Sequence, residues 1–533
     1  MQPILRLLRA MALLAGLVLA PAAVFAQAGG DAFARFGADS YAETVRAVDA
    51  LAASGHPQAA VVIEALGQGR LLAGGDTVAI RLPEGGLVDA RTGTALAAEP
   101  AGLKPVRLNN GVRRAVQAAL GGLDLVAPEA GRRIAAAEAV FKSRDAGVLP
   151  VLETAIGRES DPRALKLLRE AQAAILIGQA QTQPLDRLAA IEVLRGRGDQ
   201  DALAALRALP ADASPELKEA QARAISDIEG RLALWRAGQN LWYGLSLGSV
   251  LLLAAIGLAI TFGVMGVINM AHGEMVMLGA YTTFVVQELI RTNAPELFGW
   301  SLAIAVPAAF LVAGAVGVAI ERGVIRFLYG RPLETLLATW GISLILQQAV
   351  RTAFGPTNRE VGAPGFMSGA FELGGLAITW NRLWIIVFAG LVFAALLAIL
   401  KLTPMGLQMR AVTQNRRMAS AMGIRTGRID ALTFGLGSGV AGLAGVALSQ
   451  IDNVSPNLGQ SYIIDSFMVV VFGGVGNLWG TLISAMTLGV ANKLLEPYAG
   501  AVLGKIALLV FIILFIQKRP RGLFALKGRA VEA

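Results

Sequence analysis

The chain has 533 residues, 55% of them hydrophobic, and a mean hydropathy of +0.58, which indicates an integral membrane protein with room for a second, soluble part. It contains no Cys, and its two His residues, His56 and His272, lie far apart in sequence, so a disulfide framework is excluded and neither a metal site nor a metalloenzyme is expected. The formal net charge of +9 arises mainly from Leu241 onward, where there are 20 Lys and Arg but only 12 Asp and Glu, so we interpret it as a membrane-topology signal that gives no support for nucleic-acid binding.

Residues 1–26 have the composition of a signal peptide. Two Arg residues precede an apolar run from Ala10 to Ala20, and small residues occupy the cleavage positions of Val24-Phe25-Ala26. The apolar run is too short to span a membrane, so cleavage is expected to leave Gln27 outside the cytoplasm. The alternative is an uncleaved amphipathic anchor.

Residues 27–240 contain no spanning segment and are expected to form a mainly α-helical periplasmic domain. Glycines break Leu71 to Leu108 into short alternating pieces, which suggests a small hairpin element. Beyond Asn110 the pattern is helical, and stacked helix pairs similar to HEAT arrays are expected, since one pair alone cannot bury its apolar stripe. The expectation rests on a proposed repeat, in which Glu138, Asp145, Leu149, Leu152 and Pro162 recur as Glu192, Asp199, Leu203, Leu206 and Pro215. Chance similarity among Ala- and Leu-rich helices is the alternative.

A polar interruption follows the first spanning segment. Leu241 to Gly263 is long and apolar enough to cross a hydrocarbon core, but Asn269, His272, Gly273 and Glu274 appear before the apolar character resumes. Polar groups at membrane depth are tolerated only where they contact protein or a water-filled cavity, so this interruption is our candidate for the solute pathway. A solvent-exposed turn between two ordinary helices is the alternative.

Three stretches around this interruption carry a family resemblance: Gly244 to Ser249, Ile268 to Glu274, and Leu278-Gly279-Ala280-Tyr281. They resemble the permeases of branched-chain amino-acid-type ABC importers, and among these the urea importer permease. The resemblance runs from about Leu241 to the C-terminus, and the N-terminal extension also resembles the urea branch. It implies a second permease subunit, two ATP-binding subunits and a periplasmic solute-binding protein as partners.

Further apolar segments follow, and positive charges set their orientation. The segments are approximately Trp300 to Ile320, Leu333 to Phe354, Leu383 to Leu402, Ala431 to Leu448, Ile463 to Phe472, Thr481 to Leu495 and Ala499 to Ile516. Basic clusters near Arg322, between Lys401 and Arg428, and after Lys518 belong in the cytoplasm by the positive-inside rule. The permease domain, 241–516, is therefore expected to make about eight or nine crossings, with a cytoplasmic basic tail at 517–533.

The second basic cluster resembles the cytoplasmic coupling loop of this family, a variant of the EAA loop that docks on an ATPase subunit. Small residues are expected along one face of a short helix, while Arg416 and Arg417 project elsewhere. The loop residues are Gly406, Arg410, Ala411, Asn415, Ala419 and Gly423. Positive-inside anchoring alone is the alternative.

Two glycine-rich stretches occur in the last third of the chain. Gly437 to Gly442 spells a dinucleotide fingerprint, but it follows no strand, so close helix packing is the preferred interpretation. Phe472 to Gly480 is a second interruption, whose Gly474 and Asn477 are added to the candidate pathway, with an ordinary loop as the alternative. Asp465, Gln347, Gln348 and Thr339 are further intramembrane polar groups to which no role is assigned.

These observations predict an all-α polytopic permease in the bacterial inner membrane, with a periplasmic N-terminal domain and a cytoplasmic C-terminus. No GxxxxGK[ST] motif occurs, so ATP hydrolysis requires a separate subunit, and the chain is expected to be neither an enzyme nor a cofactor binder. Urea or a small amide is the expected solute, because few fixed charges interrupt the spanning segments. Alternatives are a branched-chain amino-acid permease, a membrane sensor with an extracytoplasmic ligand domain, and a passive channel.

Overall fold

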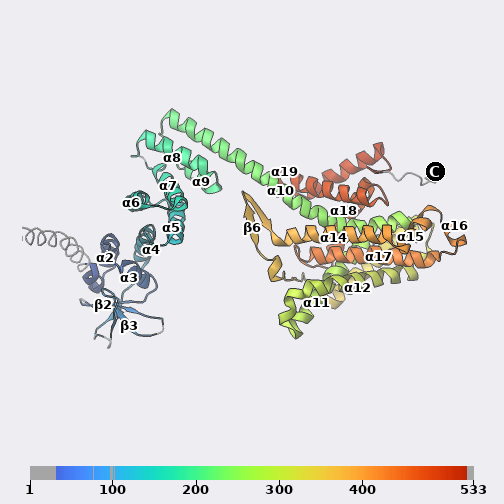
Figure 1. The fold of residues 1–533 in the computed structure, drawn as a ribbon, viewed down its shortest axis with the longest axis horizontal. Coiled ribbons are helices and arrows are strands. Elements are labelled where there is room, and N and C mark those ends of the chain that lie inside the picture. Colours follow the sequence, from blue (N-terminus) through green and yellow to red (C-terminus); the bar gives the residue numbers. More distant parts are fainter. Residues whose placement is uncertain are drawn as a thin grey trace, which may run out of the picture. The chain divides into compact units, whose positions relative to one another are not determined.

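The computed structural model describes residues 32–524 except 76, 84, 97–99, 101 and 180. The chain forms two compact units, Met1–Leu232 and Ala233–Ala533, coloured blue to green and green to red in Figure 1. One helix, α10 (Pro215–Met265), runs through the boundary between them and through the division expected after Asn240. The predicted signal peptide and most of the predicted basic tail lie outside the described residues.

The first unit begins with a small helix-and-sheet layer. Its elements are η1 (Phe36–Ala38), α2 (Tyr41–Ala53), α3 (Ala59–Gly67), β1 (Leu71–Gly74), β2 (Thr77–Arg81), β3 (Leu87–Asp89), β4 (Ala95–Leu96), β5 (Lys104–Pro105) and α4 (Asn110–Asp124). The strands form an antiparallel sheet in the order β4-β3-β2-β1-β5, with Leu71 opposite Ile80. The expected hairpin is therefore part of a five-stranded sheet, whose buried side chains pack against α2, α3 and α4.

The rest of this unit is helical: α5 (Ala130–Ser143), η2 (Ala146–Val148), α6 (Leu149–Arg158), α7 (Pro162–Leu176), α8 (Pro184–Arg197) and α9 (Gln200–Leu206). The residues of the proposed repeat occupy equivalent positions. Asp145 caps η2 just before α6, and Asp199 caps α9, while Leu152 and Leu206 are both fully buried. Pro162 and Pro215 begin α7 and α10. The HEAT-like assignment itself stays a prediction.

An enclosed ion pair joins α5 to the end of α6. Arg133 donates to Glu159 through Nε (2.6 Å) and Nη2 (2.9 Å), and its Nη1 donates to the carbonyls of Ala127 and Pro128. The hydrogen bonds from Arg133 lower the pKa of the Glu159 carboxyl from its usual range to about 2. This pair therefore contributes stability that depends on Glu159 remaining ionised.

The second unit is a helical bundle. After α10 it contains α11 (His272–Asn293), η3 (Pro295–Trp300), α12 (Ser301–Gly323), η4 (Ile325–Phe327), α13 (Pro332–Phe354), η5 (Gly365–Met367), β6 (Ala370–Leu373), β7 (Leu376–Thr379), α14 (Trp380–Leu402), α15 (Pro404–Gln414), α16 (Arg416–Ala421), α17 (Thr426–Leu448), α18 (Leu458–Gly473) and α19 (Leu478–Lys518). Within the described residues, six helical segments are long and apolar enough to cross a membrane, in α10, α12, α13, α14, α17 and α19. The expected count of eight or nine crossings stays a prediction, since α11 is outside this set and α18 is shorter.

Helix α17 is buried along almost its whole length and packs through glycines. A Cβ at Gly442 would lie 2.7 Å from the carbonyl oxygen of Ala309 on α12, and one at Gly437 would lie 2.6 Å from that of Gly257 on α10. Such distances leave no room for a side chain. The close-packing interpretation of the Gly437 to Gly442 stretch is thereby confirmed.

The β6–β7 hairpin is fixed to α10. Its turn glycines, Gly374 and Gly375, lie against the Trp235 ring, since a Cβ on either would come within 2.7 Å of that ring. The Gln239 side-chain amide donates to the Ala377 carbonyl and accepts from the Ala377 N–H, both at 2.9 Å. This pairing satisfies two backbone groups at the exposed edge of the hairpin.

Candidate functional site

The first interruption returns the chain into the bundle. Helix α10 ends at Met265, residues 266–271 are not helical, and α11 begins at His272. The His272 Nε2 lies 2.8 Å from the carbonyl oxygen of Ala254, midway along the apolar part of α10. Helix α11 therefore starts at the depth of Ala254, well before the end of α10.

The polar side chains of this interruption are enclosed. Asn269 is fully buried, and His272 and Glu274 are each 1% exposed. Asn269 Oδ1 accepts a 3.0 Å hydrogen bond from the Ala271 N–H, which closes the turn before α11. The polar side chains of the interruption are therefore buried, whereas Gly266, directly after α10, is exposed.

Helix α13 supplies a second set of polar groups. Thr335, Thr339, Ser343 and Gln347 recur every four residues and are all buried on one face of α13. Thr339 Oγ1 accepts from the Met270 N–H (3.1 Å). Thr339 and Gln347 had no role assigned from the sequence, although the spacing of Thr339, Ser343 and Gln347 indicates that they share one helix face.

Glu274 is held by this stripe. Its Oε1 accepts hydrogen bonds from Ser343 Oγ (2.9 Å) and Gln347 Nε2 (2.7 Å), whereas its Oε2 has no hydrogen-bond partner. No Lys, Arg or His among the described residues forms an ion pair with it within 4.0 Å. A buried carboxylate oxygen without a partner is costly, so it marks a place where a further donor belongs.

Two more buried polar atoms of the segment have no partner, Nδ2 of Asn269 and Nδ1 of His272. Because His272 Nε2 donates to the Ala254 carbonyl, its neutral ring offers Nδ1 as an acceptor. Residues 269–274 thus present one unused donor and two unused acceptors.

Glycines bring α18 against this segment. A Cβ on Gly273 would lie 2.4 Å from the Gly459 carbonyl oxygen, and one on Gly459 would lie 2.3 Å from that of Gly273. The first turns of α11 and α18 therefore meet backbone to backbone. Gly273 provides this close approach and offers no polar side chain to a solute.

The second interruption lies against the end of α10. A Cβ on Gly263 would be 2.5 Å from the Gly476 Cα, and Gly474 adopts a positive φ of 99°. Asn477 caps α19, accepting from the Trp479 and Gly480 N–H groups at 3.1 and 3.2 Å. Asn269, His272, Gly273 and Glu274 thus lie together at the start of α11, whereas the Asn477 side chain caps the N-terminus of α19.

The predicted coupling loop differs from the expected single helix. It contains two helices, α15 and α16, because Asn415 is extended (φ −152°, ψ 97°) and its side chain caps α16 by accepting from the Met418 N–H. The expectation of one continuous small-residue face is therefore wrong. Gly406 and Arg410 instead fix the turn after α14, where a Cβ at Gly406 would lie 2.1 Å from the Leu400 carbonyl oxygen to which Arg410 donates.

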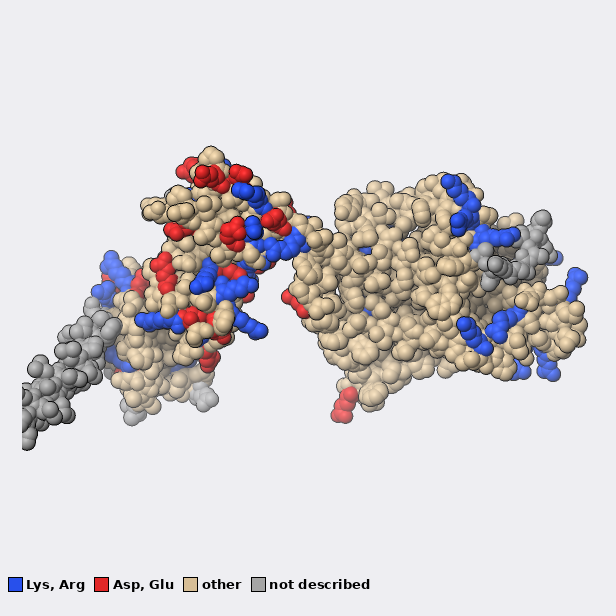
Figure 2. Space-filling model, turned by 45° about the horizontal axis from the view of Figure 1, so that its top comes forward, with Lys and Arg blue, Asp and Glu red and all other residues tan. Residues whose placement is uncertain are grey.

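The surface of the loop includes two large apolar side chains. Ala419 is only 5% exposed and packs into its own subunit, and Gly423, with φ of 86°, follows the end of α16. Met418 on α16 and Met422, directly after its last residue, are 61% and 78% exposed. Lys and Arg gather at this end of the unit (blue, right of Figure 2), where Figure 1 places α15 and α16.

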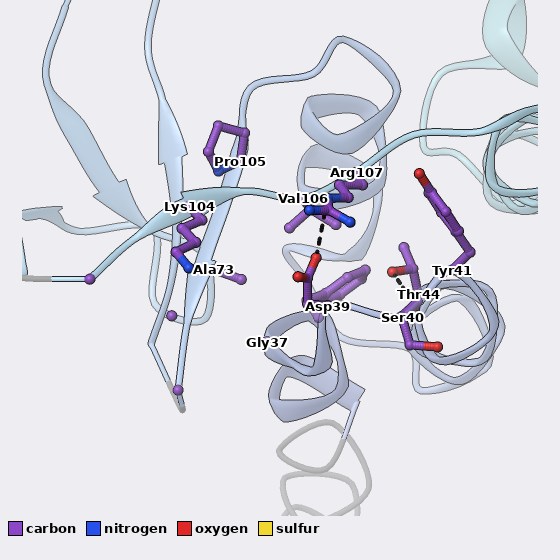
Figure 3. A pocket seen from close by; sticks show the side chains of 14 residues that line it. Gly37, Asp39, Ser40, Tyr41, Thr44, Ala73, Lys104, Pro105, Val106 and Arg107 are labelled. Atoms are coloured by element: carbon purple, nitrogen blue, oxygen red, sulfur yellow. Dashed lines mark hydrogen bonds and ion pairs between the residues drawn. The ribbon is translucent and has the colours of Figure 1, made fainter.

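A cavity of about 210 Å³ lies in the first unit between the η1–α2 segment and the β1–β5 edge of the sheet (Figure 3). Lys104, Arg107 and Asp39 lie around it. Asp39 and Arg107 are about two-thirds exposed and pair with each other at 3.4 Å, and the buried Thr44 hydroxyl donates to the Ser40 carbonyl. Its polar groups are therefore either paired or in contact with water, and we assign it no ligand.

Residues 240–517 match the family described as branched-chain amino acid transport system, permease component. The chain is 32% identical over 295 residues to the high-affinity branched-chain amino acid transport system permease protein LivH of Escherichia coli K12, covering 54% of this chain and 94% of LivH. It is 31% identical over 292 residues to BraD of Pseudomonas aeruginosa, a permease protein of the same description, again covering 54% and 94%.

A more distant similarity, 26% over 263 residues, links it to the ribose import permease protein RbsC of Escherichia coli K12, covering 48% of this chain and 77% of RbsC. No solved structure matches the chain. The family match covers the whole bundle from α10 to α19, including the interruption and the α15–α16 loop. The chain therefore belongs to the family of permease components of branched-chain amino-acid-type ABC transporters.

Proposed function

We propose that this permease moves urea, or a closely related small amide, into the cytoplasm by way of residues 269–274, driven by ATP that partner subunits hydrolyse. The observation that carries the proposal is the set of unpartnered buried atoms on Asn269, His272 and Glu274. Urea is neutral, accepts hydrogen bonds at its oxygen and donates them from both amide groups. Asn269 Nδ2 matches the urea oxygen, and Glu274 Oε2 and His272 Nδ1 match its N–H groups.

The charge inventory of the segment also supports a neutral solute. A solute carboxylate leaving water for a buried site needs a cation or a strong dipole to offset its desolvation. Residues 266–274 contain neither Lys nor Arg, and the α13 groups beside them are hydroxyls and an amide. The fixed charge that is present, on Glu274, suits donors on the solute.

A branched-chain amino acid is the second candidate, favoured by the similarity to LivH and BraD. Its ammonium group would pair with Glu274, and its carboxylate would require the N-terminal N–H groups of α11 or α18. The two candidate solutes thus differ in whether the site must hold a solute carboxylate.

The partners follow from the family: a second permease, two ATP-binding subunits and a periplasmic solute-binding protein. The basic end of the unit with α15 and α16 is proposed as cytoplasmic, and the N-terminal unit as periplasmic. We assign ATPase docking to the exposed Met418 on α16 and Met422 directly after it, since flexible apolar side chains of this kind adapt well to a partner's groove.

The test is uptake by the complex reconstituted in proteoliposomes with its ATPase and solute-binding protein. Labelled urea, acetamide and leucine are compared with and without ATP. Saturable, ATP-dependent urea uptake that excess leucine does not inhibit is expected. Leucine uptake without urea uptake would assign the chain to its amino-acid relatives, and urea flux without ATP would indicate a channel.

A further inference from the structure

The coupling loop contains a buried charge that docking does not explain. Asp430, in the second turn of α17, is fully buried, and Arg416 at the start of α16 donates to both of its carboxylate oxygens, with Nη1 to Oδ1 at 3.3 Å and Nη2 to Oδ2. The Arg416 side chain is 43% exposed, so one partner of this pair can reach water and the other cannot.

A third helix is tied to the same pair. The Arg416 guanidinium lies over the Tyr329 ring, 4.7 Å from its centroid, and the Tyr329 hydroxyl donates to Glu321 Oε1 at 2.8 Å. Glu321 is 1% exposed near the end of α12. One guanidinium therefore connects α16 directly to α17 and, through Tyr329, to α12.

The helix that carries Arg416 is bounded by two residues with non-helical backbone angles. Asn415 interrupts the helical backbone before α16, and Gly423, with a positive φ of 86°, follows it. A six-residue helix held in this way can tilt when a partner moves. The buried Ala419 also packs α16 against its own subunit, where α15 and α17 lie beside it.

Helix α17 leads from this pair to the pathway. A Cβ at Gly445 would lie 2.0 Å from the Val276 carbonyl oxygen on α11, within the helix that carries Glu274. Backbones in such close contact move together, because there is no side chain between them to rearrange. A shift of Asp430 along with Arg416 would thus be transmitted to α11.

We propose that the Arg416–Asp430 pair is the joint through which ATPase movement at α16 reaches the pathway helices, with Tyr329 as its link to α12. This inference rests on the proposed docking of the ATPase at α16. Arg416 and Asp430 are positioning residues, since neither is placed in contact with the solute. A buried ion pair is weak evidence for stability, but it fixes one geometry well, which suits a joint.

The test uses Asp430→Asn, which keeps the size of the side chain and removes the buried charge. Arg416→Gln alters the half-exposed partner and keeps the test open if Asp430→Asn accumulates poorly. Arg428→Gln is the control, because Arg428 is exposed on the same helix and, among the described residues, forms no ion pair. Solute imported per ATP hydrolysed is measured with labelled urea and labelled leucine, alongside the amount of folded complex.

Docking is followed separately. The chain has no Cys, so Ser420→Cys on the exposed side of α16 gives a single maleimide target that a docked ATPase would protect. In Asp430→Asn and Arg416→Gln we expect normal protection and ATP hydrolysis, with roughly a tenfold loss of solute imported per ATP and no loss in the control.

Normal protection with unchanged import per ATP would overturn the joint alone. The proposal would also be overturned if solute uptake, ATP hydrolysis and the amount of folded complex fell in equal proportion. That pattern would mean that the ion pair only stabilises the fold. Absence of protection in the parent complex would overturn the docking site, and the joint with it.

Discussion

Glu274→Gln is the substitution that separates the roles of the two Glu274 oxygens. A Gln carbonyl oxygen can still accept from Ser343 and Gln347, so the contact with α13 is preserved. The unpartnered Oε2, in contrast, becomes an NH2 group that cannot accept a hydrogen bond from a solute. A hydrogen bond to a charged group contributes about 1.5–3 kcal/mol, so its loss should lower urea uptake at subsaturating concentration by roughly 10- to 150-fold.

The assay is initial-rate uptake of labelled urea by the reconstituted complex, with permease quantity and ATPase copurification measured in parallel. Glu372→Gln is the matched control, because Glu372 is exposed on the β6–β7 hairpin and the substitution is chemically the same. Uptake by Glu274→Gln equal to that of the parent would refute the assignment of Oε2 to the solute.

Three further outcomes are expected. Gly279→Ala should destabilise the permease by about 1–3 kcal/mol, because its Cβ would lie 2.0 Å from an α17 carbonyl oxygen. Gly341→Ala, whose Cβ would have no atom within 4 Å, should not destabilise it. Thermal unfolding in detergent compares the two variants, and equal melting temperatures would contradict the close packing of α11 and α17. Met422→Asp should abolish ATPase copurification while leaving the permease folded, and undiminished copurification would move the docking site elsewhere. The lowered pKa of Glu159 means that its pairing with Arg133 contributes stability above about pH 4.3 that is lost as the pH falls toward 2. Pepsin should therefore cut Arg133→Gln faster than the parent at about pH 4.5 and equally fast near pH 2. Equal rates of cleavage at both pH values would show that the pair does not contribute to stability.

The order of the membrane helices could be predicted from the sequence because long apolar runs leave few alternatives in a membrane. The structure places α12, α13, α14 and α17 within a few residues of the expected segments. The interruption before His272 was also predictable, since polar residues and glycines end the apolar pattern there. The two expected segments around Ala499 correspond to two helices within α19 that meet at a kink, where Gly500, with φ of 74° and ψ of 165°, leaves the helical conformation.

The contacts of the interruption could not be predicted, because they depend on residues far away in sequence. The spacing of Thr339, Ser343 and Gln347 shows that they share a helix face, but not which element that face contacts. The same limit applies to Arg416, which was expected to project away and instead pairs with a buried Asp430. Charge alone cannot distinguish a solvated Arg from one that reaches back into its own subunit.

The loop prediction failed for a local reason. Small residues at helical spacing suggested one docking face, but Asn415 favours a cap over a helix interior and divides the loop there. Ala419 then packs inward, and the large apolar side chains exposed there are those of Met418 and Met422. Small residues in this loop allow close packing within the subunit, which sequence periodicity cannot separate from close packing between subunits.

Cysteine accessibility tests most directly whether the solute passes along residues 269–274, because the chain has no Cys of its own. Ile268→Cys, at a partly buried position beside Asn269, is treated with a small charged methanethiosulfonate reagent in the reconstituted complex, with Gly341→Cys on the open face of α13 as the control. We predict that Ile268→Cys reacts when ATP is being hydrolysed, that saturating urea slows the reaction and that leucine does not. A reaction rate at Ile268→Cys that is independent of both ATP and urea would contradict the account.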